Sequence, residues 1–79
     1  MSPTVLKWRG YRFFFFSREE QRAHVHVSGA EGEVKFWLVP DVGVAMNHGL
    51  SERRVSELKR VVEERRDGIL DAWHSHFAG

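Results

Sequence analysis

Apolar and polar residues alternate along the first two-thirds of the chain in a pattern that predicts short β-strands. Residues 4–8 are rich in β-branched and aromatic side chains and end at Arg9-Gly10, a dipeptide that suits a tight turn. Residues 11–16 predict a second strand, so the two form a β-hairpin. Aromatic residues occupy both faces of this second strand, which is typical of a strand inside a sheet or one covered by a partner.

A second hairpin is predicted further along the chain. Its strands, Ala23 to Val27 and Glu33 to Val39, flank a glycine-containing break at residues 28–32. Pro40 ends the second strand because proline cannot donate a hydrogen bond to a sheet ladder. Residues 42–46 are expected to add a short edge strand.

The last third of the chain predicts one amphipathic helix from residue 51 to about residue 77. Ser51 is a favourable N-cap. Gly68 costs about 1 kcal/mol in a helix interior, which leaves room for a bend or break there. Charges of both signs cover the polar face, so this is not a basic recognition helix. The apolar stripe repeats about every 3.6 residues and consists of Val55, Leu58, Val62, Ile69, Trp73 and Phe77.

Together these elements predict an α+β fold, in which a small antiparallel sheet of three to five strands, built from two consecutive hairpins, packs on one long C-terminal amphipathic helix. The 79 residues fit a single domain, 1–79, with the sheet over residues 1–46 and the helix over residues 50–78. The charged segment 17–22 is expected to be a loop. One helix cannot cover a four-stranded sheet completely, so one sheet face should remain open as a contact surface.

Composition narrows the class of protein. The absence of cysteine excludes disulfides and thiolate zinc sites and fits a reducing compartment. The N-terminus lacks the pattern of a secretory signal, and the aromatic run at residues 13–16 is too short to span a bilayer. We therefore expect a cytoplasmic protein with no membrane partner.

Charge is balanced overall but not locally. The net charge of +1 gives no general attraction to nucleic acid. Within residues 1–22, however, basic residues exceed acidic ones by three. Arginine outnumbers lysine nine to three, and arginine is the better residue for binding phosphate and stacking on aromatic rings.

The second hairpin brings the candidate functional residues together. Burial of its valines on one face puts His24, His26, Glu33, Lys35 and Trp37 on the other. In the antiparallel register that we expect, His26 lies opposite Glu33 and His24 lies opposite Lys35. Their Cβ atoms should then be roughly 5 Å apart.

Three interpretations of this cluster remain open. In the first, His24 and His26 act as acid and base in metal-independent RNA cleavage, Glu33 orients a histidine, and Lys35 with Arg12 stabilises phosphate charge. In the second, His24, His26 and Glu33 bind zinc or another divalent metal; otherwise no cofactor is expected. In the third, both histidines are half-exposed strand residues, and Glu33 and Lys35 form ordinary cross-strand pairs. Whether the protein is an enzyme is left undecided.

Several stretches of the chain carry a family resemblance. They are Pro3 to Leu6, Gly10 to Phe15, His24 to Val27, Glu33 to Leu38, Asn47 to Ser51 and Trp73 to Phe77. In these stretches the chain resembles a small bacterial family catalogued as domain of unknown function 4160. The usual proline before the first histidine is Ala23 here, which puts the rigidity of that loop in doubt.

The resemblance implies a class of function and no catalytic residues. Members look like one half of small two-gene modules, beside a partner of the family called domain of unknown function 2442, and are suspected toxin–antitoxin components. We therefore expect the protein either to bind a cognate small protein encoded nearby or to act on RNA, in both cases through Arg12, Lys35 and Trp37 on the open sheet face. The exposed aromatic residues also make a homodimer or heterodimer an expectation. The alternative is a non-enzymatic interaction module, an antitoxin or an adaptor.

Overall fold

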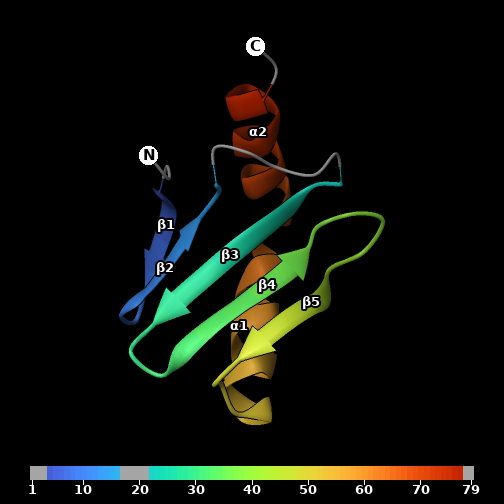
Figure 1. The fold of residues 1–79 in the computed structure, drawn as a ribbon. Coiled ribbons are helices and arrows are strands. Elements are labelled where there is room, and N and C mark those ends of the chain that lie inside the picture. Colours follow the sequence, from blue (N-terminus) through green and yellow to red (C-terminus); the bar gives the residue numbers. More distant parts are fainter. Residues whose placement is uncertain (1–3, 17–21, 78–79) are drawn as a thin grey trace.

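The structure, a computed structural model, describes residues 4–16 and 22–77. They form a five-stranded antiparallel sheet with two helices on one side of it (Figure 1). The sheet order follows the chain: β1 (Thr4–Trp8), β2 (Tyr11–Phe14), β3 (His24–Gly29), β4 (Gly32–Trp37) and β5 (Gly43–His48), followed by α1 (Glu52–Glu64) and α2 (Arg66–Phe77). The α+β class and the antiparallel sheet are confirmed. Except for Arg22, the loop expected at residues 17–22 lies outside the described residues.

Both predicted hairpins are present. The first turns at Arg9 and Gly10, which have φ values of 47° and 83°. Two such residues in succession give the turn that best matches the twist of a two-residue hairpin. The second hairpin is tighter than expected: Gly29 pairs with Gly32, so that only two residues form its turn instead of the five between 28 and 32.

This tighter turn changes the register of the second hairpin by two residues. His24 lies opposite Trp37, and His26 lies opposite Lys35. The pairings expected from the sequence, His26 with Glu33 and His24 with Lys35, are wrong. A shift of two residues keeps every side chain on its face, so burial of the valines does not distinguish the two registers.

Close backbone packing around two glycines accompanies the tight turn. A Cβ atom on Gly32 would collide with the backbone carbonyl of His48, and one on Gly49 would collide with that of Glu31. Gly49 also has a positive φ of 93°. The turn between β3 and β4 therefore packs directly against the end of β5, an approach that residues with side chains would prevent.

The predicted single helix is two helices. Ser51 caps α1 as expected, since its Oγ accepts a hydrogen bond of 3.1 Å from the Arg54 amide. The break falls at Arg65, with φ −106° and ψ 11°, and not at Gly68. Beside it, the Arg66 guanidinium donates to the Leu38 carbonyl at 2.8 Å and to the Pro40 carbonyl at 3.1 Å. We attribute the break to this anchor, a long-range contact that helical periodicity does not reveal.

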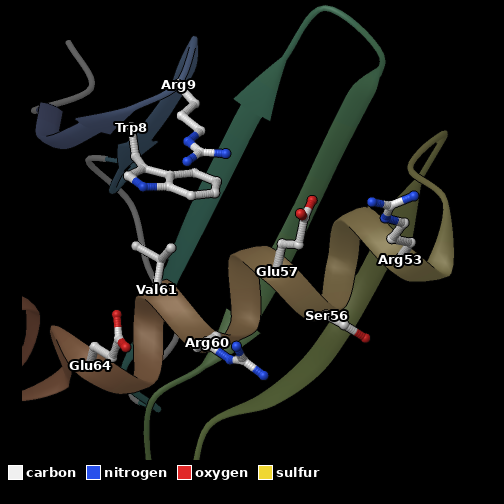
Figure 2. A pocket seen from close by; sticks show the side chains of 8 residues that line it. All are labelled: Trp8, Arg9, Arg53, Ser56, Glu57, Arg60, Val61 and Glu64. Atoms are coloured by element: carbon white, nitrogen blue, oxygen red, sulfur yellow. The ribbon is translucent and has the colours of Figure 1, made fainter.

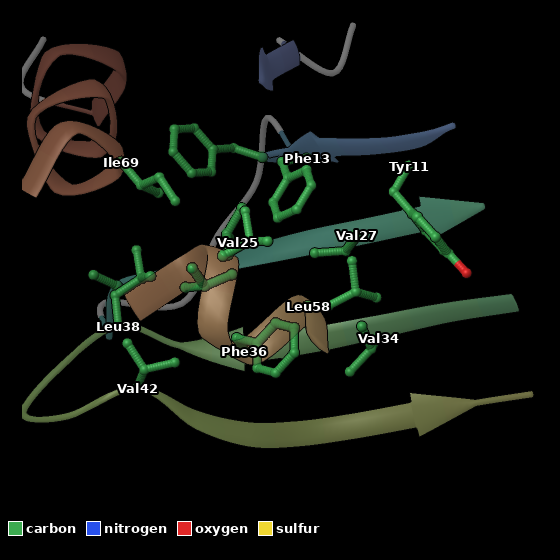
Figure 3. Close-up of a cluster of buried hydrophobic side chains, with 14 of the residues drawn as sticks. Tyr11, Phe13, Val25, Val27, Val34, Phe36, Leu38, Val42, Leu58 and Ile69 are labelled. Atoms are coloured by element: carbon green, nitrogen blue, oxygen red, sulfur yellow. The ribbon is translucent and has the colours of Figure 1, made fainter. Parts of the chain in front are cut away.

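The hydrophobic core lies between the sheet and the helices (Figure 3). Its fully buried side chains come from alternate positions of β2, β3 and β4, from the residue directly after β2 and after β4, and from both helices. They include Phe13, Phe15, Val25, Val27, Val34, Phe36, Leu38, Leu58, Val62 and Ile69. Because both helices lie on this side, the opposite sheet face carries no helix (Figure 1).

Candidate functional site

All six residues singled out from the sequence lie on the helix-free face. The register places their side chains opposite to those of the core valines and phenylalanines. We call this surface the histidine face; it consists of Arg12, Phe14, His24, His26, Ser28, Glu33, Lys35 and Trp37. Strand alternation alone is sufficient to predict this grouping.

The two histidines are buried on that face. His24 is 1% exposed and His26 is 5% exposed, so the expectation of half-exposed rings is wrong. The His26 ring stacks on Phe14 at a centroid distance of 5.5 Å and meets Phe16 edge-on at 4.3 Å. Aromatic side chains therefore cover His26 on the face that carries no helix.

His24 joins the two faces of the structure at one end of the sheet. Its ring centroid lies 5.2 Å from that of His26, 5.6 Å from Trp37 and 5.0 Å from Trp73 of α2. Its Nδ1 lies 2.8 Å from the carbonyl oxygen of Arg22. A carbonyl only accepts hydrogen bonds, so Nδ1 carries the proton in this contact. The ring is thus held by packing on several sides and by the hydrogen bond to Arg22.

Glu33 approaches His26 diagonally across the hairpin. The Glu33 carboxylate oxygen Oε2 lies 3.5 Å from His26 Nδ1, although Glu33 pairs directly with Ser28. The proximity expected from the sequence is therefore present despite the changed register, because diagonal neighbours are within reach of long side chains. This carboxylate can orient the imidazole.

Cationic side chains stack on aromatic rings across the same face. The Arg12 guanidinium lies 4.3 Å from the centroid of the Phe14 ring. Trp37 receives two cations, with the Arg22 guanidinium 4.3 Å and Lys35 Nζ 4.6 Å from its ring. Arg12 is exposed, whereas Lys35 and Trp37 are half-buried. Such contacts hold positive charge in place at a surface.

Two further cations extend the surface that the sequence indicated. Lys7 pairs with Arg12 on the neighbouring strand β1 and is exposed. Arg22 reaches Trp37 from just before β3, where its Nε also donates to the Val39 carbonyl at 2.9 Å. The sequence analysis did not include either residue in the site. Arg22 could have been included, because it stands two positions before His24 and strand alternation would put both side chains on the same face.

The geometry gives the metal-binding interpretation no support. Within residues 4–16 and 22–77, no three or more His, Cys, Asp or Glu side chains group in a way that could hold a metal ion. Binding of zinc or another divalent metal by His24, His26 and Glu33 therefore stays a hypothesis drawn from the sequence.

A separate hollow lies on the helix side of the molecule. It is a pocket of about 450 Å³ between the first hairpin and α1, and it is lined by Trp8, Arg9, Arg53, Ser56, Glu57, Arg60, Val61 and Glu64 (Figure 2). The Arg9 guanidinium lies 5.1 Å from the Trp8 ring, and Glu57 and Glu64 add acidic groups to the lining. None of the six candidate residues lines this pocket.

Comparison with known protein families gives a match. The family described as "Domain of unknown function (DUF4160)" matches residues 10–74, which include the complete histidine face. The chain belongs to this family. Comparison with curated proteins and with solved structures gives no significant match. In the described part of the chain, neither helix has the length and apolar character needed to cross a bilayer.

Proposed function

We propose that this member of the DUF4160 family binds single-stranded RNA through the histidine face, as one component of a two-protein, toxin–antitoxin-like module of the cytoplasm. One observation carries the proposal. In the part of the chain that the structure describes, the helix-free face gathers Lys7, Arg12, Arg22 and Lys35 near the Glu33 carboxylate, and aromatic rings lie beneath the last three of these cations.

The chemistry of this surface suits an RNA strand. Phosphates are bound by guanidinium and ammonium groups, and unpaired bases stack on aromatic rings and on guanidinium planes. Trp37 is half-buried and holds the Arg22 and Lys35 cations over its ring, so groups that bind phosphates and a guanidinium plane on which a base can stack lie together. The cations lie on neighbouring strands, which spreads them over the face as an extended backbone requires.

Burial of the histidines favours binding over cleavage. A general base must reach the proton that it removes, by a direct hydrogen bond or through one water. His24 and His26 are covered by aromatic rings, and the Nδ1 proton of His24 already points at the Arg22 carbonyl. In the proposed function the histidines form the floor that supports Trp37 and Phe14, and Glu33 helps to orient His26.

The proposal that the protein is one component of a two-protein module rests on its family. Membership is shown, and the family resemblance implies a cognate small protein encoded nearby. A partner that covers the histidine face would compete with RNA for the same cations, which gives the pair a simple means of regulation.

Binding can be measured by fluorescence anisotropy with a labelled single-stranded RNA oligonucleotide. We expect Arg12→Ala and Lys35→Ala each to weaken binding by roughly 3- to 10-fold, since each removes a contact to phosphate. Arg60→Ala is the matched control, because Arg60 is an exposed arginine of α1 away from the histidine face. No binding by the wild type, or equal losses in the control, would contradict the proposal.

Cleavage is tested separately with the same RNA. The wild type and the His24→Ala/His26→Ala variant are incubated with it, the products are separated on a denaturing gel, and circular dichroism establishes that both proteins are folded. Intact RNA in both samples agrees with a binding role. Cleavage by the wild type that a folded variant lacks would instead assign acid–base chemistry to the histidines. A growth assay with induced expression of each protein shows whether the wild type or the variant is toxic to the cell.

A further inference from the structure

The free edge of β5 is built for strand addition, and we propose that it pairs with β5 of a second copy of this chain. β5 hydrogen-bonds to β4 on one side, and the sheet ends on its other side (Figure 1). An edge strand presents unpaired backbone amides and carbonyls to an incoming strand. The dimer would join the two five-stranded sheets into one.

β5 has a bulge but lacks two other common protections of an edge strand, charged residues and proline. Natural edges are commonly guarded by lysine or other charged residues and by proline. The six residues of β5, Gly-Val-Ala-Met-Asn-His, include no Lys, Arg, Asp, Glu or Pro. The other edge, β1, carries the exposed Lys7. A bulge in the pairing between Lys35 and Phe36 of β4 bends β5 locally, but it does not add charge to the edge.

Apolar side chains mark the same edge. Val44 is 47% exposed and Met46 is 41% exposed; in the described residues only Phe16 is a comparably exposed large hydrophobic residue. A groove of about 340 Å³ runs beside Val44 toward α1, with Val55 and Ser56 among its lining residues. This groove gives an apolar side chain of an added strand a place to pack.

Charge favours a second copy over a foreign strand as the occupant. In a twofold antiparallel pair, each residue of β5 faces another residue of β5. A strand with Lys, Arg, Asp or Glu would then bring like charges together, which destabilises cross-strand pairs, whereas β5 contains none of these four residue types. A strand selected for a different protein would be expected to carry complementary charges that set partner and register.

The dimer has a consequence for the histidine face. The twofold axis of an antiparallel edge-to-edge pair runs perpendicular to the sheet, so both histidine faces lie on the same side. Two cationic surfaces would then be continuous and would span a longer RNA. This consequence rests on the proposed function, whereas the dimer does not, because assembly is measured without RNA.

Mass and distance measurements test the interface. Light scattering after size-exclusion chromatography should give twice the mass of one chain at high protein concentration. We expect Val44→Lys/Met46→Lys to give the monomer mass, since it brings like charges together across the interface. Thr4→Lys is the matched control, because it puts a lysine at an exposed position of the opposite edge and should leave the dimer intact.

Spin labels locate the interface even if the double lysine variant fails to fold. The chain has no cysteine, so Met46→Cys and Thr4→Cys each provide a single labelling site. With strands about 4.8 Å apart, labels at residue 46 should be within about 20 Å of each other, and labels at residue 4 on the order of 40 Å apart. A monomeric wild type, a dimer that survives in a folded lysine variant, or short distances at residue 4 would each overturn the proposal.

Discussion

Tyr11 and Glu31 form a charged hydrogen bond that links the two hairpins. Tyr11 Oη donates to Glu31 Oε1 at 2.6 Å. This bond lowers the pKa of the Glu31 carboxyl below its ordinary value. The pKa of Tyr11 is raised, first by burial of the phenol and then by the same bond. Both shifts favour the state in which a neutral phenol donates to a carboxylate.

The pH dependence of stability follows from the signs of these shifts. Because folding lowers the Glu31 pKa, the contribution of the bond is present above the ordinary carboxyl pKa and is lost as the pH falls through the folded value. Because folding raises the Tyr11 pKa, the contribution is also lost as the pH rises through a value above 10.0.

Tyr11→Phe should therefore lower the free energy of unfolding most at neutral pH, with the difference from wild type shrinking in acid and in strong alkali. Urea midpoints across this pH range provide the measurement. Glu31→Gln is the control for the other partner of the bond. It should also reduce the change in stability that occurs as the pH falls. A difference that stays constant at every pH would show that ionisation of this pair does not affect stability.

The ring of Tyr11 also lies directly over Gly29. A Cβ atom on Gly29 would overlap the ring carbons of Tyr11, and that ring is buried. We expect Gly29→Ala to destabilise the protein by about 1–3 kcal/mol, because the ring must leave its packed position. Gly43→Ala is the matched strand control, since its Cβ would meet nothing within 4 Å. Equal urea midpoints for the two variants would disprove this packing argument.

At the scale of single residues, the sequence predicts which face of the sheet a side chain lies on better than it predicts how deeply that side chain is buried. Alternation puts His24 and His26 on the face opposite to the core, and this is where they lie. Their burial depends on Phe14, which pairs with His26 from another hairpin, and on Trp73 of α2. These neighbours come together only through long-range pairing, so local sequence patterns do not reveal them.

At the scale of elements, the predictions that were wrong, the hairpin register and the unbroken helix, concern features that depend on tertiary contacts. The five strands follow from period-two alternation and turn residues, and the Ser51 cap follows from local chemistry. The register of the second hairpin depends on how closely Gly32 approaches the end of β5. The helix break depends on Arg66 and on carbonyls 26 and 28 residues away. No local pattern contains either contact.

The Arg66 anchor can be tested against its neighbour. Arg66 donates to two backbone carbonyls that follow β4, so Arg66→Ala should reduce stability by about 1–3 kcal/mol. Arg66→Lys should recover little of this, because one ammonium group does not reproduce the planar fork. The exposed neighbour Arg65→Ala is the control, and urea unfolding is the measurement. Full stability in Arg66→Ala would show that these two hydrogen bonds do not stabilise the fold.

At the scale of the whole molecule, placing both helices on one side determines what the protein can contact. A single apolar stripe near the C-terminus is enough to predict that one sheet face remains open. The sequence does not predict that aromatic rings on that face bury the histidines while the cations stay at the surface. Arg12 and Lys7 remain exposed there, and Arg12 lies over Phe14, one of the rings that bury His26. The face therefore combines a packed aromatic layer with a charged outer layer.

Salt dependence measures how many of these cations bind RNA together. For single strands, log K falls against log salt concentration with a slope of about −0.7 for each phosphate that the protein neutralises. Full use of Lys7, Arg12, Arg22 and Lys35 thus predicts a slope of about −2 to −3. Arg12→Ala should reduce its magnitude by about 0.7, and Arg60→Ala should leave it unchanged, because Arg60 projects from α1. A slope near zero would mean that the cations of the histidine face do not contact phosphate, whatever the affinity.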